Sequence, residues 1–372
     1  MEVIFLMRID AFNKTGGDTQ QIKNYVKELN KLGVNATIST DLSIDLSNYD
    51  IVNLVNIDRP IETWEFYKKA KRLEKKIVLI SIHHSYEQIN HFEKTQRSGV
   101  LRLINVFARD FWKREKVKNL IRSINHPELF TASLKMLFSN VKEKQKEIIR
   151  ESDLVITLAE KEAIEINRDF DLTISTTDYL IVKNGVNLPS KQVNFKKKKY
   201  DVLVVGRIEP RKNQLNIIKA LAGSDIKVLF VGKENGNSKS YVNEFKKQIK
   251  CNENMSYLGA VEYEKMKEVY MASKVHLSAS WFEVTPLVDI EALYFGCNIV
   301  TTENSFSEEY LGEFAEFVNP SNIEDIKGKI IKSLGKPQIQ NAQVYIKNNF
   351  NWERSTKLLF ESYNKILIRE GS

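Results

Sequence analysis

Two glutamates in the second half of the chain have a spacing that could bind a sugar. Glu283 and Glu291 are separated by seven residues in WFEVTPLVDIEALYFGCNIVTT. Thr285 is a good N-cap residue and Pro286 suits the first helical position, so we expect a helix that begins at Pro286 and ends near Gly296. One glutamate then precedes the helix and the other lies inside it. Two carboxylates repel an anion and are better suited to accept hydrogen bonds from hydroxyl groups of a sugar or ribose.

A basic loop earlier in the chain could bind the opposite kind of group. In GRIEPRKNQ, Arg207 and Lys212 follow a β-branched run, and Asn213 is placed to cap the next helix. Cations beside a helix N-terminus can bind phosphate, because fixed charge and backbone N–H groups converge on one anion. The helix between the two glutamates offers the N–H groups of Leu287 and Val288 in the same way. Each pattern also has an ordinary explanation, a solvated basic turn or two unrelated glutamates.

Glycines and histidines follow two of the expected strands in the first half. Gly16 and Gly17 precede a helix in RIDAFNKTGGDTQQ, and paired glycines permit positive φ and close approach of a ligand. His83 and His84, in SIHHSYEQ, stand at the end of another strand. Successive side chains of a strand face opposite sides, so we expect one histidine to face a ligand and favour His83. The alternatives are a flexible loop tip for the glycines and a packing or surface role for the other histidine.

Short β-branched runs alternate with helical patterns along the chain, which is typical of parallel sheets covered by helices. In the first half we expect strands at 3–7, 36–40, 51–56, 77–83, 154–158 and 179–183, and helices at 19–32, 100–122 and 130–150. In the second half we expect strands at 202–205, 227–231, 256–258, 275–278 and 298–301, and helices at 214–221, 241–250, 263–271 and 286–295.

The polar, basic stretch NLPSKQVNFKKKK interrupts this alternation and reads as a linker. With 372 residues and 42% apolar content, the chain can form two cores. We therefore expect an N-terminal domain at 1–187, a linker at 188–199, a C-terminal domain at 200–348 and a closing helix in 349–372.

Composition narrows the classes of partner. The formal net charge of +8 favours anionic partners, and two cysteines are too few for a disulfide framework, so we expect a cytoplasmic protein. The apolar run in MEVIFLMRID is too short to span a bilayer and reads as a first strand. No dinucleotide fingerprint, P-loop, Asp-x-Asp pair, His/Cys metal cluster or nucleic-acid module is evident, so we expect no metal and no nucleic acid.

Residues 97–122 form a basic amphipathic stretch, RSGVLRLINVFARDFWKREKVKNLIR. It contains eight lysines and arginines against Asp110 and Glu115, with apolar residues at helical spacing. Such a helix could rest on an anionic membrane surface, which would place the protein at the inner face of the cell membrane. The alternative is a helix that covers the sheet of its own domain.

Taken in order, these motifs resemble the family-four retaining glycosyltransferases of the GT-B fold. That family carries Gly-Arg-x4-Lys, several βα units and then Glu-x7-Glu in its C-terminal domain, as this chain does. SDLVITLAEKE, YLIVKNGVN and NWERSTKLLFESY extend the likeness to most of residues 1–20 and 150–365. One departure is Glu-Val-Thr-Pro where many members have Glu-Gly-Phe-Gly, so Val284 and Thr285 replace small residues near the sugar.

The resemblance implies an α/β GT-B fold of two Rossmann-like domains that face a central cleft, with the C-terminal helix crossing back to the N-terminal domain. Cations, glycines and helical N–H groups would bind the donor diphosphate: Arg207, Lys212, Gly16, Gly17, Leu287 and Val288. Glu291 would hold the ribose, and the sugar-contacting loop would include Val284 and Thr285. The catalytic positions would be Glu283, His83 and His84.

The implied reaction moves a sugar, with retention of configuration, from a nucleoside-diphosphate sugar to an acceptor hydroxyl. No cofactor or metal is expected, and UDP is favoured over GDP as the nucleotide. The acceptor would be a saccharide or lipid-linked saccharide in bacterial surface polysaccharide or glycan assembly. A different class of protein, a non-catalytic GT-B adaptor or chaperone, stays open, although both cations and both glutamates are present. A nucleotide-sugar epimerase lacks support because the Glu-x7-Glu loop is the transferase pattern.

Overall fold

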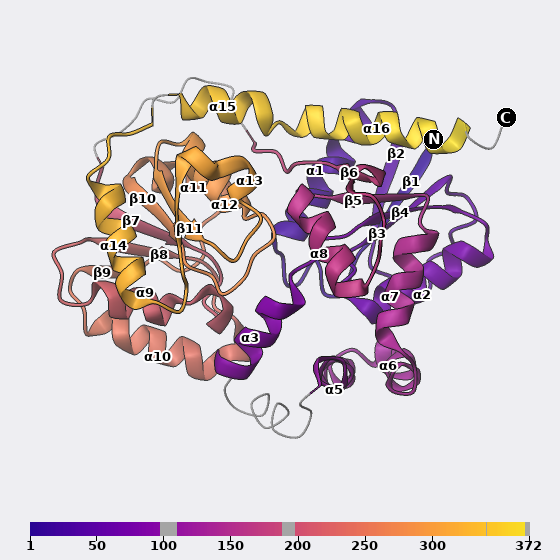
Figure 1. The fold of residues 1–372 in the computed structure, drawn as a ribbon, viewed down its shortest axis with the longest axis horizontal. Coiled ribbons are helices and arrows are strands. Elements are labelled where there is room, and N and C mark those ends of the chain that lie inside the picture. The colour runs from indigo at the N-terminus through magenta and orange to yellow at the C-terminus, as the bar shows by residue number, and fades with distance from the viewer. Residues whose placement is uncertain (97–109, 188–197, 340, 369–372) are drawn as a thin grey trace. The chain divides into compact units, whose positions relative to one another are not determined.

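The structure is a computed structural model that describes residues 1–96, 110–187, 198–339 and 341–368. The chain divides into two compact units: unit 1 comprises Met1–Gly185 and Trp352–Ser372, and unit 2 comprises Val186–Asn351. Each unit contains one six-stranded sheet covered by helices, as the ribbon in Figure 1 shows for each unit by itself. The expected α/β chain with two sheets is therefore confirmed.

All described strand pairings in the sheet of unit 1 are parallel, and its order is β2-β1-β3-β4-β5-β6. The bounds are β1 Glu2–Leu6, β2 Asn35–Ser39, β3 Ile51–Val55, β4 Lys76–Ile80, β5 Leu154–Thr157 and β6 Tyr179–Ile181. The chain winds outward from β1 to β2 on one side and from β3 to β6 on the other. In doubly wound sheets, such a reversal creates a crevice beyond the carboxyl ends of the two central strands, here β1 and β3.

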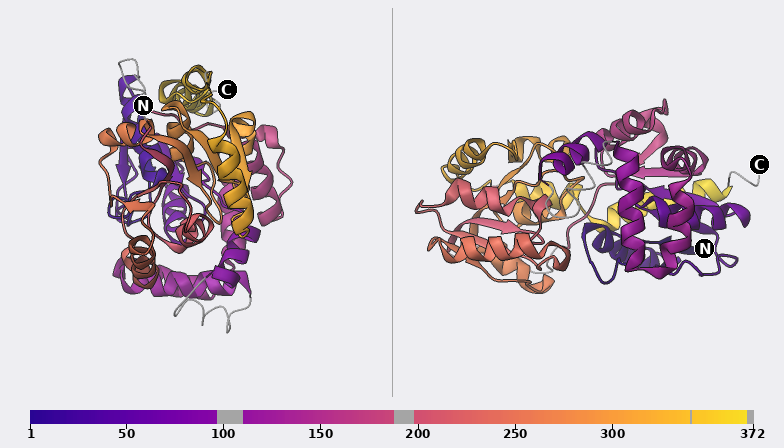
Figure 2. Two further views of the ribbon diagram at one scale, coloured as in Figure 1. Left: turned by 90° about the vertical axis from the view of Figure 1, so that its left-hand side faces the viewer. Right: turned by 90° about the horizontal axis from the view of Figure 1, so that it is seen from below.

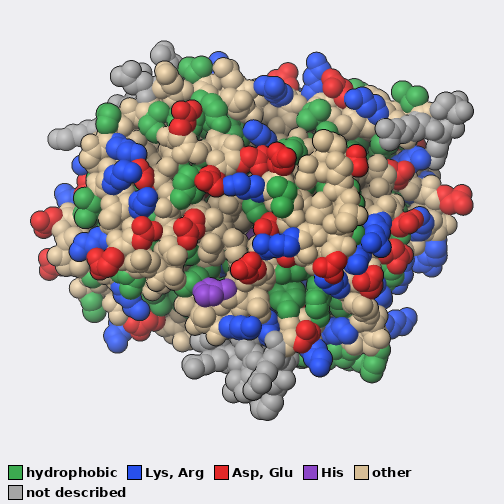
Figure 3. Space-filling model, viewed as in Figure 1, with side chains coloured by type: hydrophobic (Ala, Val, Ile, Leu, Met, Phe, Trp, Pro, Cys, Tyr) green, Lys and Arg blue, Asp and Glu red, His purple; other side chains and the backbone are tan. Residues whose placement is uncertain are grey.

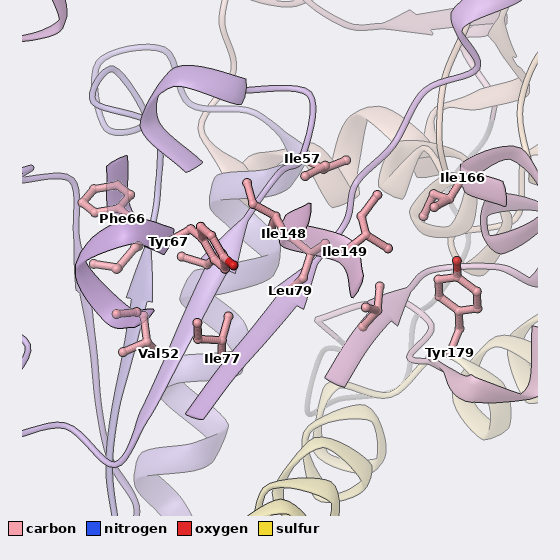
Figure 4. Close-up of a cluster of buried hydrophobic side chains, with 14 of the residues drawn as sticks. Val52, Ile57, Phe66, Tyr67, Ile77, Leu79, Ile148, Ile149, Ile166 and Tyr179 are labelled. Atoms are coloured by element: carbon pink, nitrogen blue, oxygen red, sulfur yellow. The ribbon is translucent and has the colours of Figure 1, made fainter. Parts of the chain in front are cut away.

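The helices of unit 1 pack on this sheet through apolar faces. Their bounds are α1 Gly17–Lys31, α2 Pro60–Arg72, α3 Tyr86–Gln96, α5 Phe111–Ile124, α6 Phe130–Leu137, α7 Val141–Glu151, α8 Glu160–Phe170 and α16 Trp352–Ile368. Figure 4 shows one cluster in which Val52 and Leu79 of the sheet meet Phe66 of α2, Ile148 of α7 and Ile166 of α8. Because strand side chains alternate between faces, this cluster fills only one face of the sheet.

The last helix, α16, returns the chain to unit 1. The Tyr363 hydroxyl donates to Asn53 Oδ1 at 2.6 Å, and the Trp352 ring packs edge-on against Tyr25 with centroids 5.7 Å apart. Gly185 lies against the start of the helix, since a Cβ there would be 2.4 Å from the Trp352 backbone nitrogen. A larger residue at this position would push α16 away from its seat.

The sheet of unit 2 has the order β12-β11-β10-β7-β8-β9 and is parallel in all its described pairings. The bounds are β7 Tyr200–Val205, β8 Val228–Val231, β9 Met255–Tyr257, β10 Ser273–Ser278, β11 Asn298–Thr302 and β12 Ala315–Val318. Read from β9, this is the Rossmann strand order, with its reversal between β7 and β10. Unit 1 has the other common doubly wound order, so both units are Rossmann-like in the broad sense.

Helices cover both faces of the unit 2 sheet (Figure 2). Their bounds are α9 Gln214–Leu221, α10 Lys239–Lys250, α11 Tyr263–Met271, α12 Leu287–Tyr294, α13 Glu308–Leu311, α14 Ile323–Leu334 and α15 Ala342–Asn349. Val202 and Val204 of β7 pack in one apolar cluster, whereas Leu203 between them packs in the other. The period of two in a strand thus divides one apolar run between two helical layers.

Two helix predictions in unit 1 need correction. The single helix expected at 130–150 is broken into α6 and α7, because Asn140 starts a new helix by accepting a hydrogen bond from Glu143 N at 3.3 Å. The helix expected at 100–122 lies partly outside the described residues. Its described part is α5, which begins at Phe111 and is capped by Asp110.

Several helices were not predicted, namely α2, α3, α8, α13, α14 and α15. The first three are rich in polar residues, and their apolar positions become evident as core only when the sheet they cover is known. The bounds of α9 and α11 agree with prediction. No helix in the described part of the chain is both long and apolar enough to cross a bilayer.

Candidate functional site

The reversal point of the unit 2 sheet brings together two loops that are distant in sequence. One loop follows β7 and the other follows β10, and these strands are neighbours. Trp281 N donates to Arg211 O at 2.9 Å, and Asn213 Nδ2 donates to Ala279 O at 3.0 Å. The loops are therefore hydrogen-bonded to each other at the sheet edge where doubly wound folds bind ligands.

Asn213 differs from its expected role as a helix cap. It precedes α9 but has φ 60° and ψ 24°, and its side chain makes no capping hydrogen bond. The side-chain amide donates instead to the carbonyl oxygens of Ala279, at 3.0 Å, and Pro320, at 2.8 Å. The Asn213 side chain, which the local sequence predicts to cap α9, therefore forms tertiary hydrogen bonds instead.

Glu283 is paired with two cations from the β7 loop. Lys212 Nζ lies 2.5 Å from Glu283 Oε1, and Arg211 Nη1 lies 3.0 Å from the same oxygen. Burial by itself would raise the pKa of Glu283, but Arg211 and Lys212 outweigh it and hold that pKa well below its usual range. The carboxylate is therefore ionised at neutral pH, where it can accept hydrogen bonds from hydroxyl groups. Arg211 was not predicted, although it stands next to Lys212 in the same basic run.

Arg207 and a second carboxylate complete the charges of this loop. Arg207 Nη2 is 3.4 Å from Glu209 Oε1, and Arg211 Nε is 3.4 Å from the same atom. Burial would raise the pKa of Glu209, but the cations Arg211 and Arg207 lower it. The site thus contains three cations, Arg207, Arg211 and Lys212. It contains two carboxylates, Glu209 and Glu283. One positive charge is left over, which favours an anionic ligand.

A close backbone approach shapes the same edge of the sheet. Gly232, after β8, has φ 152°, and a Cβ there would lie 1.9 Å from the Gly206 carbonyl oxygen. A Cβ at Gly206 would lie 3.3 Å from Lys212 Cδ. Gly206 is the glycine of the Gly-Arg-x4-Lys motif, whereas Gly232 was not singled out in the sequence, because the carbonyl group that it approaches belongs to another loop.

Helix α12, which follows Glu283 and contains Glu291, begins one residue later than expected. Its first residue is Leu287, its N-cap is Pro286, and no side chain caps it, so the expectation that Thr285 is the N-cap is wrong. Gly296 has φ 81° and follows the end of the helix, as expected. Leu287 and Val288 occupy the first turn, where N–H groups have no partner within the helix.

The residues between the glutamates are held inside unit 2. Val284 and Thr285 are 5% and 8% exposed. Glu283 N donates to Asn304 O at 2.9 Å, and Phe306 N donates to Val284 O at 2.9 Å. The loop is therefore pinned by backbone hydrogen bonds to the segment after β11. Contact of Val284 and Thr285 with a sugar stays a prediction.

Glu291 is buried, so it is not an ordinary exposed helix residue. It is 8% exposed, and its two oxygens accept hydrogen bonds from the hydroxyl groups of Tyr263 and Tyr270, each at 2.9 Å. Burial raises the pKa of Glu291, and the two hydrogen bonds only partly offset this. Tyr263 itself is 41% exposed, so the group reaches the surface of unit 2. The seven-residue spacing of the tyrosines places them on one face of α11, and this signal was overlooked in the sequence.

A buried polar group under α12 was also missed. Asp289 Oδ2 accepts from the Thr301 hydroxyl at 2.6 Å, and Asp289 Oδ1 is 3.2 Å from His276 Nδ1. All three side chains are fully buried. They join the first turn of α12 to β10 and β11 and so help to fix the helix that carries Glu291.

His83 in unit 1 is fully buried, and each ring nitrogen contacts a carboxylate. Nδ1 is 2.7 Å from Asp58 Oδ1, and Nε2 is 3.0 Å from Asp169 Oδ2. Burial lowers the pKa of His83, but the two carboxylates raise it to about 10. The expectation that His83 is the histidine facing a ligand is therefore wrong. A protonated ring with both nitrogens occupied has a structural role, which argues against catalysis by His83.

His84 is the more accessible of the two histidines. Its side chain is 22% exposed, and its Nδ1 is 3.1 Å from Asp58 Oδ2. The strand-alternation argument failed here because β4 ends at Ile80 and Ile82 has φ 46°. The chain has already turned before the histidines, so their directions follow from the turn.

The glycine pair stands at the start of α1, but for a different reason than expected. Gly16 is the N-cap with φ −145°, and Gly17 is the first helical residue, so neither residue uses positive φ. A Cβ on Gly16 would lie 2.9 Å from Asp18 Oδ1. A larger residue at Gly16 would therefore have to displace the carboxylate of Asp18, which binds Arg8. Gly16 and Gly17 lie at the reversal point of the unit 1 sheet.

The distribution of charged side chains gives no sign of a metal site in the described part of the chain. Within the described ranges, no group of three or more His, Cys, Asp or Glu side chains could hold a metal ion. Basic and acidic side chains are interspersed on the face shown in Figure 3. The net charge of +8 is thus not concentrated on that face.

Comparison with known proteins agrees with this geometry. Residues 188–352, which span most of unit 2, match the sequence model of the glycosyl transferases group 1. An uncharacterized glycosyltransferase of Methanocaldococcus jannaschii is 23% identical over 355 residues, covering 87% of this chain and 82% of the relative.

Solved structures share the fold over nearly the whole chain. Sucrose-phosphate synthase from Thermosynechococcus elongatus is 13% identical with a TM-score of 0.71, covering 99% of this chain and 100% of the other. HepE of Anabaena, solved in complex with UDP, is 14% identical with a TM-score of 0.66, covering 98% of this chain and 100% of the other. The fold is therefore that of GT-B glycosyltransferases, and the matches support glycosyl transfer as the general activity.

Proposed function

We propose that the protein is a retaining family-four glycosyltransferase that moves a sugar from a nucleoside-diphosphate sugar to an acceptor hydroxyl. The observation that carries this proposal is the contact of Lys212 with Glu283 at the reversal point of the unit 2 sheet. A phosphate-binding cation and a hydroxyl-accepting carboxylate meet there beside the N-terminus of α12. These are the groups that a sugar diphosphate requires.

The donor diphosphate would be bound by Lys212, Arg207 and the first N–H groups of α12, those of Leu287 and Val288. Their charge and dipoles would stabilise the negative charge that develops on the departing nucleotide. Fixed cations and a helix N-terminus can supply this stabilisation without a metal ion, so we propose a metal-independent reaction with no cofactor.

Glu283 would accept hydrogen bonds from hydroxyl groups of the transferred sugar. When Lys212 turns to the phosphate, Arg211 still holds the carboxylate ionised at 3.0 Å. A carboxylate with so low a pKa is a poor proton acceptor. We therefore assign Glu283 to positioning the sugar, and the acceptor proton would pass to an oxygen of the leaving phosphate.

Glu291 would hold the ribose. The Tyr263 and Tyr270 hydroxyls use one lone pair on each carboxylate oxygen and fix its orientation, which leaves further lone pairs for two ribose hydroxyls. We propose UDP as the nucleotide, supported by the likeness to HepE, which was solved with UDP.

The acceptor is proposed to be a saccharide or lipid-linked saccharide presented at an anionic membrane surface. α6 and the residue after it expose Phe130, Leu134 and Phe138 at four-residue spacing, 48%, 43% and 88% exposed, beside the exposed Lys135. Apolar side chains with nearby cations favour an interfacial contact. In a flotation assay, the wild-type protein should float with anionic liposomes, whereas a Phe130→Ser, Phe138→Ser double variant should not. If the wild type does not float, a soluble acceptor is the better explanation.

A thermal-shift panel with UDP-, GDP- and ADP-sugars tests the donor site. We expect a UDP-sugar to raise the melting temperature of the wild type and of Lys219→Ala, an exposed lysine of α9, but not of Lys212→Ala. Release of UDP in the presence of acceptor then measures turnover. If no nucleotide stabilises the wild type, the transferase proposal fails and a non-catalytic adaptor becomes the better reading.

A further inference from the structure

An ionic cluster occupies the reversal point of the unit 1 sheet, beyond the carboxyl ends of β1 and β3. No step of the proposed sugar transfer uses its charged side chains. The cluster comprises four cations and three carboxylates: Arg8, Lys14, Arg59, Arg122, Asp10, Asp18 and Glu62. Crevices at such reversal points are the usual ligand sites of doubly wound sheets.

Most of the cluster is paired internally. Arg8 Nη1 is 2.6 Å from Asp10 Oδ1, and Arg8 Nε is 2.8 Å from Asp18 Oδ2. The remaining nitrogen of Arg8 donates to the Lys14 carbonyl oxygen at 2.7 Å, and Lys14 Nζ is 3.1 Å from Asp10 Oδ2. Arg8 is thus fully occupied and supplies fixed positive charge.

Arg122 is only partly satisfied. Its Nη2 is 2.5 Å from Glu62 Oε1 and 3.3 Å from Asp10 Oδ1. Its Nε is buried and has no hydrogen-bond partner among the described residues. One donor of this guanidinium therefore lacks an acceptor.

Arg59 is the cation of the cluster that forms no ion pair with any residue in the described ranges. It is partly exposed, and burial, followed by the nearby charges of Arg122 and Arg8, lowers its pKa. Four cations against three carboxylates leave one positive charge, and the pairings place it on Arg59. A desolvated cation crowded by other cations is an unfavourable arrangement unless an anion joins it.

Local hydrogen bonds hold the loop that carries Arg59 in its conformation. Asn56 has φ 77°, its side chain accepts from Asp58 N at 3.0 Å, and its carbonyl accepts from the Thr63 hydroxyl at 3.0 Å. Arg59 is the N-cap residue of α2, and α1 begins at the same edge of the sheet. Two helix N-termini thus add positive potential to the same place.

We propose that Arg59, with Arg122 and Arg8 beside it, binds a phosphate-type oxyanion carried by the acceptor substrate. The assignment of the anion to the acceptor rests on the proposed function. The anion site itself is argued from residues of unit 1 alone. A guanidinium fork of Arg59 fits two phosphate oxygens, and the positive charges of Arg122 and Arg8 add to the attraction. The acceptor is therefore a phosphorylated saccharide or a lipid-linked one with its phosphate in this crevice.

Titration of the full-length protein with inorganic phosphate at constant ionic strength tests the site. We expect Arg59→Gln to weaken phosphate binding at least about tenfold, since a charge-assisted fork is lost. Arg72→Gln removes the same charge from the exposed far end of α2 and should bind phosphate as the wild type does. Arg59→Lys should retain part of the affinity, which separates charge from folding.

Two further readouts make the result decisive. Without ligand, Arg59→Gln should melt at a higher temperature than the wild type, because a crowded cation is removed; a lower melting temperature would make Arg59 a structural residue and overturn the proposal. UDP binding should be lost in Lys212→Ala and kept in Arg59→Gln. If Arg59→Gln weakens UDP and phosphate equally, the site belongs to the donor and the inference is wrong, as it is if the wild type does not bind phosphate. If the wild type binds phosphate but not UDP, the result counts against the proposed donor site and not against the anion site.

Discussion

Replacing His83 with glutamine would remove a buried positive charge from between two carboxylates. In the folded protein, burial lowers the pKa of His83, but Asp58 and Asp169 raise it to about 10. An unfolded histidine has a pKa of about 6.5. The pKa of His83 is therefore higher in the folded state, so the protonated ring stabilises the fold. The low pKa of Asp58 reports the same interaction and is counted once.

The size and sign of the effect follow from linkage. A rise from about 6.5 to about 10 corresponds to about 4–5 kcal/mol, fully present below pH 6.5 and lost as pH rises toward 10. We therefore expect His83→Gln to be less stable than the wild type by about 4 kcal/mol at pH 6. At pH 9 the difference should shrink to about 1 kcal/mol, because most of the contribution of the charge is then lost.

Urea unfolding followed by tryptophan fluorescence is a suitable assay. Three of the four tryptophans lie in unit 1, namely Trp64, Trp112 and Trp352, so the signal chiefly follows the unit that contains His83. His91→Gln, an exposed histidine of α3, is the matched control and should behave as the wild type. A stability difference that stays constant from pH 6 to pH 9 would refute the charged clamp, as would a difference below about 1 kcal/mol at pH 6.

Three other outcomes are expected. Glu291→Gln should weaken UDP binding about tenfold, whereas Glu283→Gln should chiefly lower turnover; equal and negligible effects in titration and rate assays would contradict both roles. Gly232→Ala should destabilise unit 2 by at least about 3 kcal/mol, since its Cβ would overlap a carbonyl oxygen, whereas Gly236→Ala meets no atom within 4 Å and should melt normally. Burial raises the pKa of Glu316, but three lysines lower it to about 2. The free energy of unfolding should therefore fall as pH drops from about 4.5 toward 2, and Glu316→Gln should reduce this pH dependence in urea unfolding.

Much of the candidate donor site was predictable because its signals are local. Arg207 and Lys212 lie in one loop, and Glu283 and Glu291 flank one helix start, so their order along the chain indicates the chemistry before any contact is known. The alternation of β-branched runs and helical patterns likewise predicted two parallel sheets, whose carboxyl ends place these loops at one edge.

The sequence by itself determined the α/β alternation and the residue types that could bind phosphate and hydroxyl groups. Only the tertiary structure decided which partners those residues meet. Arg211 joins Glu283 across two loops, His83 lies buried between two aspartates, and Arg59 forms no ion pair with the residues that the structure describes. These outcomes depend on which strands are neighbours and on how deeply each charge is buried. Neither property is encoded in the spacing of nearby residues, because parallel pairing joins segments separated by whole βα units.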